Sequence, residues 1–272
     1  MKKLLILSLG MAAFAGCASD ASGPKREEND SLKDRGSFCK AWANAACTDE
    51  VVQACQSTDK ETCLVAQKAF CVELVPAGYV STTAEKCIAA VKSAYSDEEL
   101  TKEELDVVVN LGGACSQLVK GGIESGGTCR ASTECDTTRG YSCVVKPGSS
   151  DGTCQIAKLQ EPASKCTGLD QICQSGTYCD EGGHCVDTEP EHAACDYDAM
   201  CDASLRCVLE DPNDPTTGTC EKKLARSKEC DPTKPEECIS GICLEGANGV
   251  AKCADYVGLT FGSSYCVGLG GG

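Results

Sequence analysis

Histidine and aromatic side chains are scarce in this chain of 272 residues. Its histidines are His184 and His192, and aromatic residues account for 4% of the positions. So few aromatic side chains argue against a large continuous hydrophobic core. Nucleophilic catalysis needs a base beside the nucleophile, and histidine most often fills that role. We therefore expect two exposed polar histidines, no catalytic residues and a protein that is not an enzyme.

Metal-binding patterns are lacking as well. No two cysteines stand in the Cys-x-x-Cys spacing that is typical of zinc ligands. Oxygen ligands for calcium are offered by Asp196 and Asp198 and by the run Asp211–Asp214, but neither set follows the spacing of an EF-hand loop. We expect no metal and no cofactor, and we leave calcium binding open as an alternative.

Beyond its N-terminus the chain has no apolar run long enough to span a bilayer. The apolar stretch Leu4–Phe14 has 11 residues and follows two lysines, which is typical of a signal peptide. The sequence is acidic, with a formal net charge of −16. Because nucleic acids and anionic lipid surfaces repel such a chain, we expect no nucleic-acid partner.

The signal-like stretch ends in Phe14-Ala15-Gly16-Cys17. This motif resembles the lipobox of bacterial lipoproteins, in which small residues precede the cysteine that carries the lipid; Phe14 stands where Leu or Val is usual. The resemblance implies a signal peptide over 1–16 and a lipid anchor on Cys17. It also implies a cell-envelope location, anchored in the outer membrane and facing the periplasm or the cell surface. The competing interpretation is an ordinary secretory signal cleaved near Ala15 or Ala18.

Cysteine, in contrast, is abundant. The sequence has 25 cysteines, and setting Cys17 aside leaves 24, an even number. Unpaired cysteines at this density would be a hazard in an oxidising compartment, whereas paired cysteines form a scaffold. The sequence therefore predicts that the remaining cysteines pair as disulfides outside the cytoplasm.

Two different regions follow Cys17. Residues 17–36 are polar and charged, which predicts a lipidated, disordered tether. Residues 37–120 are alanine-rich and contain four Ser/Thr-x-x-Glu patterns, which mark helix N-termini. These patterns begin at Thr58, Thr82, Ser96 and Thr101. We expect a helical cysteine-containing domain, with helices over roughly 37–47, 59–74, 83–95, 101–109 and 114–119.

Five cysteines of this helical region lie eight residues apart, at positions 39, 47, 55, 63 and 71. If 37–47 folds back antiparallel on 59–74, then Cys39 faces Cys71 and Cys47 faces Cys63, and two disulfides clamp the hairpin. This arrangement resembles the twin-cysteine helical hairpins of some small oxidised proteins. A local bond between Cys47 and Cys55 is the alternative. The cysteines without an assigned partner are Cys55, Cys87, Cys115 and Cys266.

From residue 121 the cysteines recur in four blocks of four, with similar gaps inside each block. Blocks 1 to 4 cover 121–158, 159–188, 189–222 and 223–255, and a tail over 256–272 follows. A glycine two residues before the last cysteine, as at Gly152, Gly183 and Gly218, suits a hairpin turn with positive φ. We expect each block to be a two-stranded β-hairpin knot and the glycines of 267–272 to form a flexible tail.

The expected fold class is therefore small and disulfide-rich. An α-helical, disulfide-clamped N-terminal domain precedes four tandem four-cysteine repeats that are hairpin-like or knot-like. The four blocks account for 16 of the 24 remaining cysteines, and the helical region contains seven. Cys266 is the one that belongs to neither group. Either this residue bonds back to the helical region, or a disulfide crosses a block boundary.

The blocks resemble the Dickkopf N-terminal-like cysteine-rich repeats found in many lipobox-bearing surface proteins of Gram-negative bacteria. The resemblance covers about 121–253 and rests on cysteine spacing and a few glycines. Four cysteines allow three connectivities. The interlocked arrangement common in such modules joins the first cysteine to the third and the second to the fourth. It implies Cys129–Cys143 with Cys135–Cys154, Cys166–Cys179 with Cys173–Cys185, Cys195–Cys207 with Cys201–Cys220, and Cys230–Cys243 with Cys238–Cys253.

The sequence favours a lipid-anchored, non-enzymatic surface protein that acts as a binding or structural module. Its expected partners are the membrane, through the lipid anchor, and another envelope or extracellular protein. A glycan is the second candidate partner, although the aromatic residues suited to it are few: Tyr141, Tyr178, Tyr197 and Tyr256. The competing function is a protease inhibitor that presents a disulfide-braced loop such as Val144–Gly152.

Overall fold

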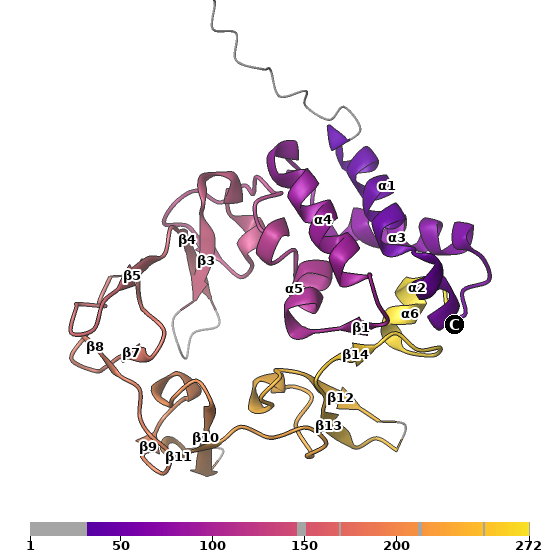
Figure 1. The fold of residues 1–272 in the computed structure, drawn as a ribbon. Helices are drawn as coiled ribbons and strands as arrows, with labels where there is room; N and C mark the ends of the chain where they lie inside the picture. Colours follow the sequence, from indigo (N-terminus) through magenta and orange to yellow (C-terminus); the bar gives the residue numbers. More distant parts are fainter. Residues whose placement is uncertain (1–31, 146–150, 169, 212–213, 247, 272) are drawn as a thin grey trace, which may run out of the picture. The chain divides into compact units, whose positions relative to one another are not determined.

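The computed structural model describes residues 32–145, 151–168, 170–211, 214–246 and 248–271. The protein is small and disulfide-rich, and a helical N-terminal region precedes several small sheets (Figure 1). Twelve disulfides join the described residues. Within the described part of the chain, no helix combines the length and the apolar composition needed to cross a membrane. The predicted anchor, Cys17, lies outside the described residues.

The helices match four of the five expected ranges to within two residues at each end. They are α1 (Arg35–Ala46), α2 (Asp49–Ala54), α3 (Lys60–Leu74), α4 (Ala84–Ala94), α5 (Lys102–Asn110) and α6 (Ser264–Gly268). Helices α2 and α6 were not predicted from the sequence. The helix expected over 114–119 is wrong, since only a 3-10 turn forms at Gly113–Cys115. Leu111, which is left-handed with φ of 54°, ends α5 just before it.

Side-chain caps decide where the helices begin. The capping box expected at Thr101 is present, because the Thr101 backbone N–H donates to the Glu104 carboxylate at 2.9 Å. At α3 the cap is Asp59 instead of Thr58, because the Asp59 carboxylate accepts a backbone N–H at 2.7 Å. The pattern that begins at Ser96 starts no helix, and a short strand follows it.

The folded region begins before residue 37. Asp34 caps α1 by accepting the Ser37 backbone N–H at 2.9 Å. Leu32 is buried, and its carbonyl accepts a hydrogen bond of 2.6 Å from the Tyr79 hydroxyl. The last residues of the expected tether, 32–36, are therefore part of the helical region, because they have both a cap and a core contact.

One continuous core fills the helical region, contrary to the expectation drawn from the scarcity of aromatic residues. Phe38 and Trp42 are completely buried at its centre, and their neighbours are mainly valine, leucine, alanine and disulfide-bonded cysteine. Cysteine behaves as a small hydrophobe when buried, so the disulfides themselves supply apolar volume. Four residues of the C-terminal segment also belong to this core: Val257, Leu259, Cys266 and Leu269.

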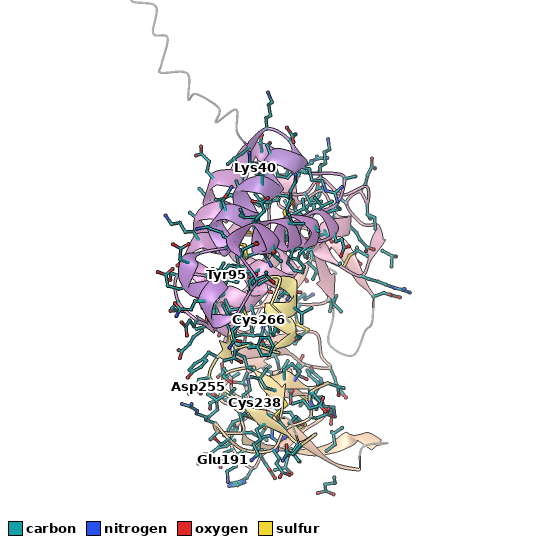
Figure 2. The ribbon with its side chains drawn as sticks, turned by 90° about the vertical axis from the view of Figure 1, so that its right-hand side faces the viewer. Lys40, Tyr95, Glu191, Cys238, Asp255 and Cys266 are labelled. Atoms are coloured by element: carbon teal, nitrogen blue, oxygen red, sulfur yellow. A yellow bond between two sulfur atoms is a disulfide. The ribbon has the colours of Figure 1, made fainter. Side chains whose placement is uncertain are left out.

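The C-terminal segment returns to the helical region. Strand β14 (Val257–Gly258) pairs antiparallel with β1 (Glu99–Leu100), and Cys266 on α6 (Figure 2) forms a disulfide with Cys55. A Cβ atom at Gly271 would lie 2.2 Å from the Cys55 carbonyl oxygen. The expected flexible tail is therefore wrong over 267–271. Glycine is needed there because the backbone passes too close to Cys55 for a side chain.

Five further sheets occupy residues 128–253. Strands β2 (Thr128–Cys129), β3 (Ser142–Val145) and β4 (Gly152–Gln155) form one in the order β2-β4-β3. Strands β5 (Lys158–Gln160) and β6 (Gln171–Cys173) pair in parallel, and β7 (Thr177–Cys179) pairs antiparallel with β8 (Cys185–Asp187). Strands β9 (Ala194–Cys195), β10 (Leu205–Asp211) and β11 (Asp214–Lys222) follow in the order β10-β11-β9, and β12 (Cys243–Glu245) pairs with β13 (Ala251–Cys253). Blocks 1 and 3 thus gain a third strand beyond the expected hairpin.

Two of the three glycines assigned to turns have a different role. Gly183 has φ of 75°, as a turn requires, but Gly152 and Gly218 lie inside strands. A Cβ atom at Gly152 would lie 2.6 Å from the Cys143 sulfur, and one at Gly218 would lie 2.6 Å from the Cys207 sulfur. These glycines make room for a disulfide on the facing strand, so the turn interpretation is wrong for them.

Candidate functional site

The structure joins twenty cysteines in ten disulfides whose Cα–Cα distances are 5.4–6.0 Å. They are Cys39–Cys71, Cys47–Cys63, Cys129–Cys143, Cys135–Cys154, Cys166–Cys179, Cys173–Cys185, Cys195–Cys207, Cys201–Cys220, Cys230–Cys243 and Cys238–Cys253. Each of these cysteines has the partner assigned to it above. The four left over pair as Cys55–Cys266 and Cys87–Cys115. Cys266 therefore reaches back to the helical region, and the alternative Cys47–Cys55 bond is not formed.

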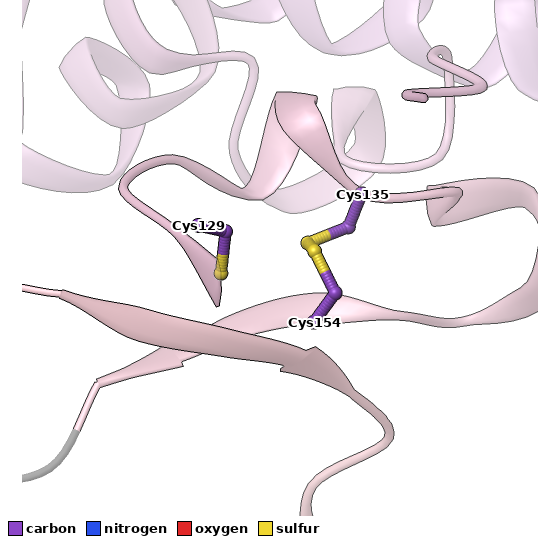
Figure 3. Close-up of side chains that lie close together, drawn as sticks. All are labelled: Cys129, Cys135 and Cys154. Atoms are coloured by element: carbon purple, nitrogen blue, oxygen red, sulfur yellow. A yellow bond between two sulfur atoms is a disulfide. The ribbon is translucent and has the colours of Figure 1, made fainter. Parts of the chain in front are cut away.

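The sulfur atoms cluster inside each block. Cys129, Cys135 and Cys154 have sulfurs within 4.8 Å of one another (Figure 3), and the other blocks each contain an equivalent trio. Such a cluster would suit a soft metal if its thiolates were free. Here Cys135 is bonded to Cys154, and Cys129 is bonded to Cys143. We therefore interpret the clusters as crossed disulfides that brace each block.

The polar residues singled out from the sequence are spread along the surface. His184 and His192 are both exposed. The Asp198 carboxylate accepts the Cys207 backbone N–H at 2.6 Å, so it already links the 3-10 turn Asp198–Met200 to strand β10. The side chains of the other calcium candidates, Asp211–Asp214, lie outside the described residues.

An apolar groove of about 270 Å³ lies among blocks 1, 2 and 3. Its walls include Val145 on β3, Ile172 on β6, Tyr178 on β7, and Tyr197 and Ala199 at the start of a 3-10 turn in block 3. Val145 is 46% exposed and Ile172 is 38% exposed. We call these five residues the tyrosine groove. Residues 146–150 of the loop Val144–Gly152 lie outside the described residues.

Leu159 extends the apolar surface of the tyrosine groove. It is the register partner of Ile172 in the parallel pair β5–β6, so the two side chains stand on the same face of that sheet. Leu159 is 72% exposed, the highest value among the large apolar residues of the described chain. A contiguous exposed apolar patch of this kind marks an interaction surface more often than scattered single residues do.

The two tyrosine hydroxyls are held in place by hydrogen bonds. Tyr178 donates to the Glu189 carboxylate, and Tyr197 donates to the Cys179 carbonyl, each at 3.3 Å. Burial raises the pKa of both hydroxyls, and the neighbouring carboxylates raise it further. The hydroxyls therefore stay protonated in the physiological range, and the rings present apolar faces instead of negative charge.

Blocks 2 and 3, which supply most of the walls of this groove, are strongly acidic. Residues 159–222, which form blocks 2 and 3, contain fourteen acidic and three basic residues, so they carry −11 of the net charge of −16. Asp180 and Asp196 both act electrostatically on Tyr197, and Glu189 acts on Tyr178. The tyrosine groove can therefore bind an apolar side chain, and the acidic residues near it can attract cations.

Sequence reasoning found only part of this site. It named Tyr178 and Tyr197 as aromatic candidates, but it missed Val145, Leu159 and Ile172. None of these three belongs to a periodic apolar pattern in the sequence. Only the strand pairing and the packing of the blocks bring them together.

The two other tyrosines named from the sequence lie in a different setting. Arg139 places its guanidinium carbon 5.3 Å from the Tyr141 ring centre, and Arg226 lies 5.9 Å from that of Tyr256. Intramolecular cations already cover these rings, which makes them weaker candidates for contacting a partner.

Comparisons of this chain with protein-family models, with curated proteins and with solved structures found no match.

Proposed function

We propose that this protein is a lipid-anchored protein of the bacterial cell envelope that binds another envelope or extracellular protein and has no enzymatic role. The anchor is Cys17, the tether follows it, and the tyrosine groove is the binding surface. The main support for the binding role is this groove. Its exposed apolar residues lie on strands that disulfides hold in place. A scaffold of this kind keeps a recognition surface preorganised, which lowers the entropy lost on binding.

We further propose that blocks 1 to 4 are tandem repeats of the Dickkopf N-terminal-like kind. Two recurrent pairings support this. The second cysteine of each block pairs in parallel with a residue 12 to 14 positions earlier, as in Ile123–Cys135, Gln160–Cys173, Glu189–Cys201 and Leu224–Cys238. The third and fourth cysteines are antiparallel register partners in every block: Cys143–Cys154, Cys179–Cys185, Cys207–Cys220 and Cys243–Cys253.

Lipid attachment gives the first test. Cells that produce the protein and are fed an alkyne fatty acid should label it, and Cys17→Ser should abolish the label and leave an unprocessed precursor. The reason is chemical, since serine has no thiol to receive the lipid. Label that persists on the Cys17→Ser protein would disprove the anchor, and a processed but unlabelled wild-type protein would favour ordinary secretion.

Protein binding gives the second test. A photo-crosslinking amino acid placed at Leu159 in the producing cells should yield a discrete protein adduct after illumination. The matched control is the same amino acid at Val65, which is 62% exposed on α3. Equal adducts at both positions would show random collision, and the absence of any adduct at Leu159 would remove the proposed binding surface.

A further inference from the structure

We infer that the tyrosine groove recognises a cationic segment of a partner protein, in which an apolar side chain enters the groove and a neighbouring arginine or lysine meets the surrounding carboxylates. This inference rests on the proposed binding role and adds the chemistry of the partner.

The size of the groove favours a protein side chain over a small molecule. Small-molecule sites typically enclose about 300–1,000 Å³ and bury most of the ligand. The tyrosine groove offers about 270 Å³, and two of its walls are only partly buried, since Val145 and Ile172 are 46% and 38% exposed. That space suits one inserted side chain, and Leu159 beside Ile172 supplies further contact for the residues next to it.

The negative charge near the groove favours basic residues in the partner, next to the side chain that enters the groove. Blocks 2 and 3 carry −11 of the net charge of −16. Among the described residues, Asp180, Glu189 and Asp196 take part in none of the ion pairs. These carboxylates act electrostatically on the two tyrosines, and none of them is paired with a basic side chain in the part of the chain that the structure describes. An acidic partner would be repelled there, and a neutral one would gain nothing from them, whereas a basic one would be attracted and steered.

The protein's own arginines show how such a contact is made. Arg139 and Arg226 lie over the rings of Tyr141 and Tyr256. Within the described part of the chain, no arginine or lysine covers Tyr178 or Tyr197 in this way. A partner arginine over either ring would form the same cation–π contact and would reach a carboxylate with its guanidinium edge.

A selection experiment tests this inference. The full mature chain, oxidised and carrying Cys17→Ser to keep it in solution, is used to select short random peptides displayed on phage. Enriched peptides should contain an apolar residue next to arginine or lysine, and they should bind more weakly at high ionic strength. Tyr178→Ala with Tyr197→Ala should weaken binding by about tenfold or more. Asp180→Asn with Asp196→Asn should weaken it by about twofold to fivefold at low salt.

Controls separate this inference from unfolding and from the binding role itself. Ile239→Ala removes an apolar side chain that is 70% exposed in block 4, and it should leave peptide binding unchanged. The Tyr178→Phe with Tyr197→Phe protein keeps both rings and should retain most of the affinity. Enriched peptides without basic residues, peptides that bind the tyrosine variants equally, or no enrichment at all would overturn the inference. An adduct at Leu159 in cells, found together with any of these results, would leave the binding role standing and reject only the cationic partner.

Discussion

Replacing Cys55 and Cys266 together with alanine should release the C-terminal segment from the helical region and produce the largest loss of stability among the disulfide variants. This bond spans 211 residues, whereas the disulfides inside the blocks span 12 to 19. In the chain-entropy description, a longer closed loop restricts the unfolded chain more strongly. The stabilisation is about 5 kcal/mol for a loop of this length and about 3 kcal/mol for a loop of 15 residues. The other disulfides shorten the effective loop, so the first figure is an upper bound.

The double variant should also lose contacts in the folded state. Leu259 and Leu269 are each 1% exposed, and both lie in the core of the helical region. Once the bond to Cys55 is gone, β14 and the terminal residues are held by non-covalent contacts: two register pairs, these apolar contacts, and hydrogen bonds such as the one from Gln67 to the Gly268 carbonyl. We expect faster amide exchange over 257–271 and a lower midpoint of denaturant unfolding, followed by the fluorescence of Trp42, the sole tryptophan.

The matched control replaces Cys238 and Cys253, whose bond spans 15 residues within block 4. That variant should lose less stability in the helical region, because no part of its loop includes α1 to α5. Equal effects of the two double variants on Trp42 unfolding would contradict the role assigned to Cys55–Cys266. Unchanged amide exchange over 257–271 would contradict it as well.

The link between Cys55 and Cys266 also shows where sequence reasoning ends. Helices α1 and α3 follow from alanine content and a cysteine spacing of eight, and the start of α3 follows from a cap pattern; all of these are local signals. The partner of Cys55 depends on where the chain goes 211 residues later, and no local pattern encodes that. The flexible tail predicted from the terminal glycines was wrong for the same reason. Gly271 looks flexible in the sequence, but in the fold it is the one residue type that can pass beside Cys55.

The core and the candidate site could not be predicted from the sequence, because both depend on contacts between residues far apart in the chain. Counting aromatic residues underestimates a core in which cystine, valine and alanine supply much of the volume, as they do around Phe38. The tyrosine groove draws its walls from three blocks, and neither Val145 nor Ile172 belongs to a periodic apolar pattern. Their neighbourhood arises from strand pairing and from the way consecutive blocks pack, which spacing alone does not determine.

Trp42 should be the most costly single residue to remove from the helical region. Its side chain is completely buried, and its ring lies 6.1 Å from that of Phe38. Its indole N–H donates to the Gln67 side-chain oxygen at 3.2 Å, and the Gln67 amide nitrogen donates to the Gly268 carbonyl at 2.7 Å. Trp42 thus supports a buried polar link between α1, α3 and α6. Trp42→Ala should lower the free energy of unfolding by about 3–5 kcal/mol, since large aromatic truncations leave a cavity.

Two further variants separate packing from hydrogen bonding at this position. Trp42→Phe keeps most of the apolar volume but leaves the Gln67 oxygen without its donor, so it should cost about 1–3 kcal/mol. Val65→Ala, at an exposed position on α3, should change stability by less than about 0.5 kcal/mol. Denaturant unfolding followed by far-ultraviolet circular dichroism measures all three, because it does not need the tryptophan. The disulfides Cys39–Cys71 and Cys47–Cys63 still join α1 to α3 in each variant, so the loss should be one of stability and not of topology. A Trp42→Ala protein as stable as the Val65→Ala protein would show that the helical region is held by its disulfides alone, without the core described above.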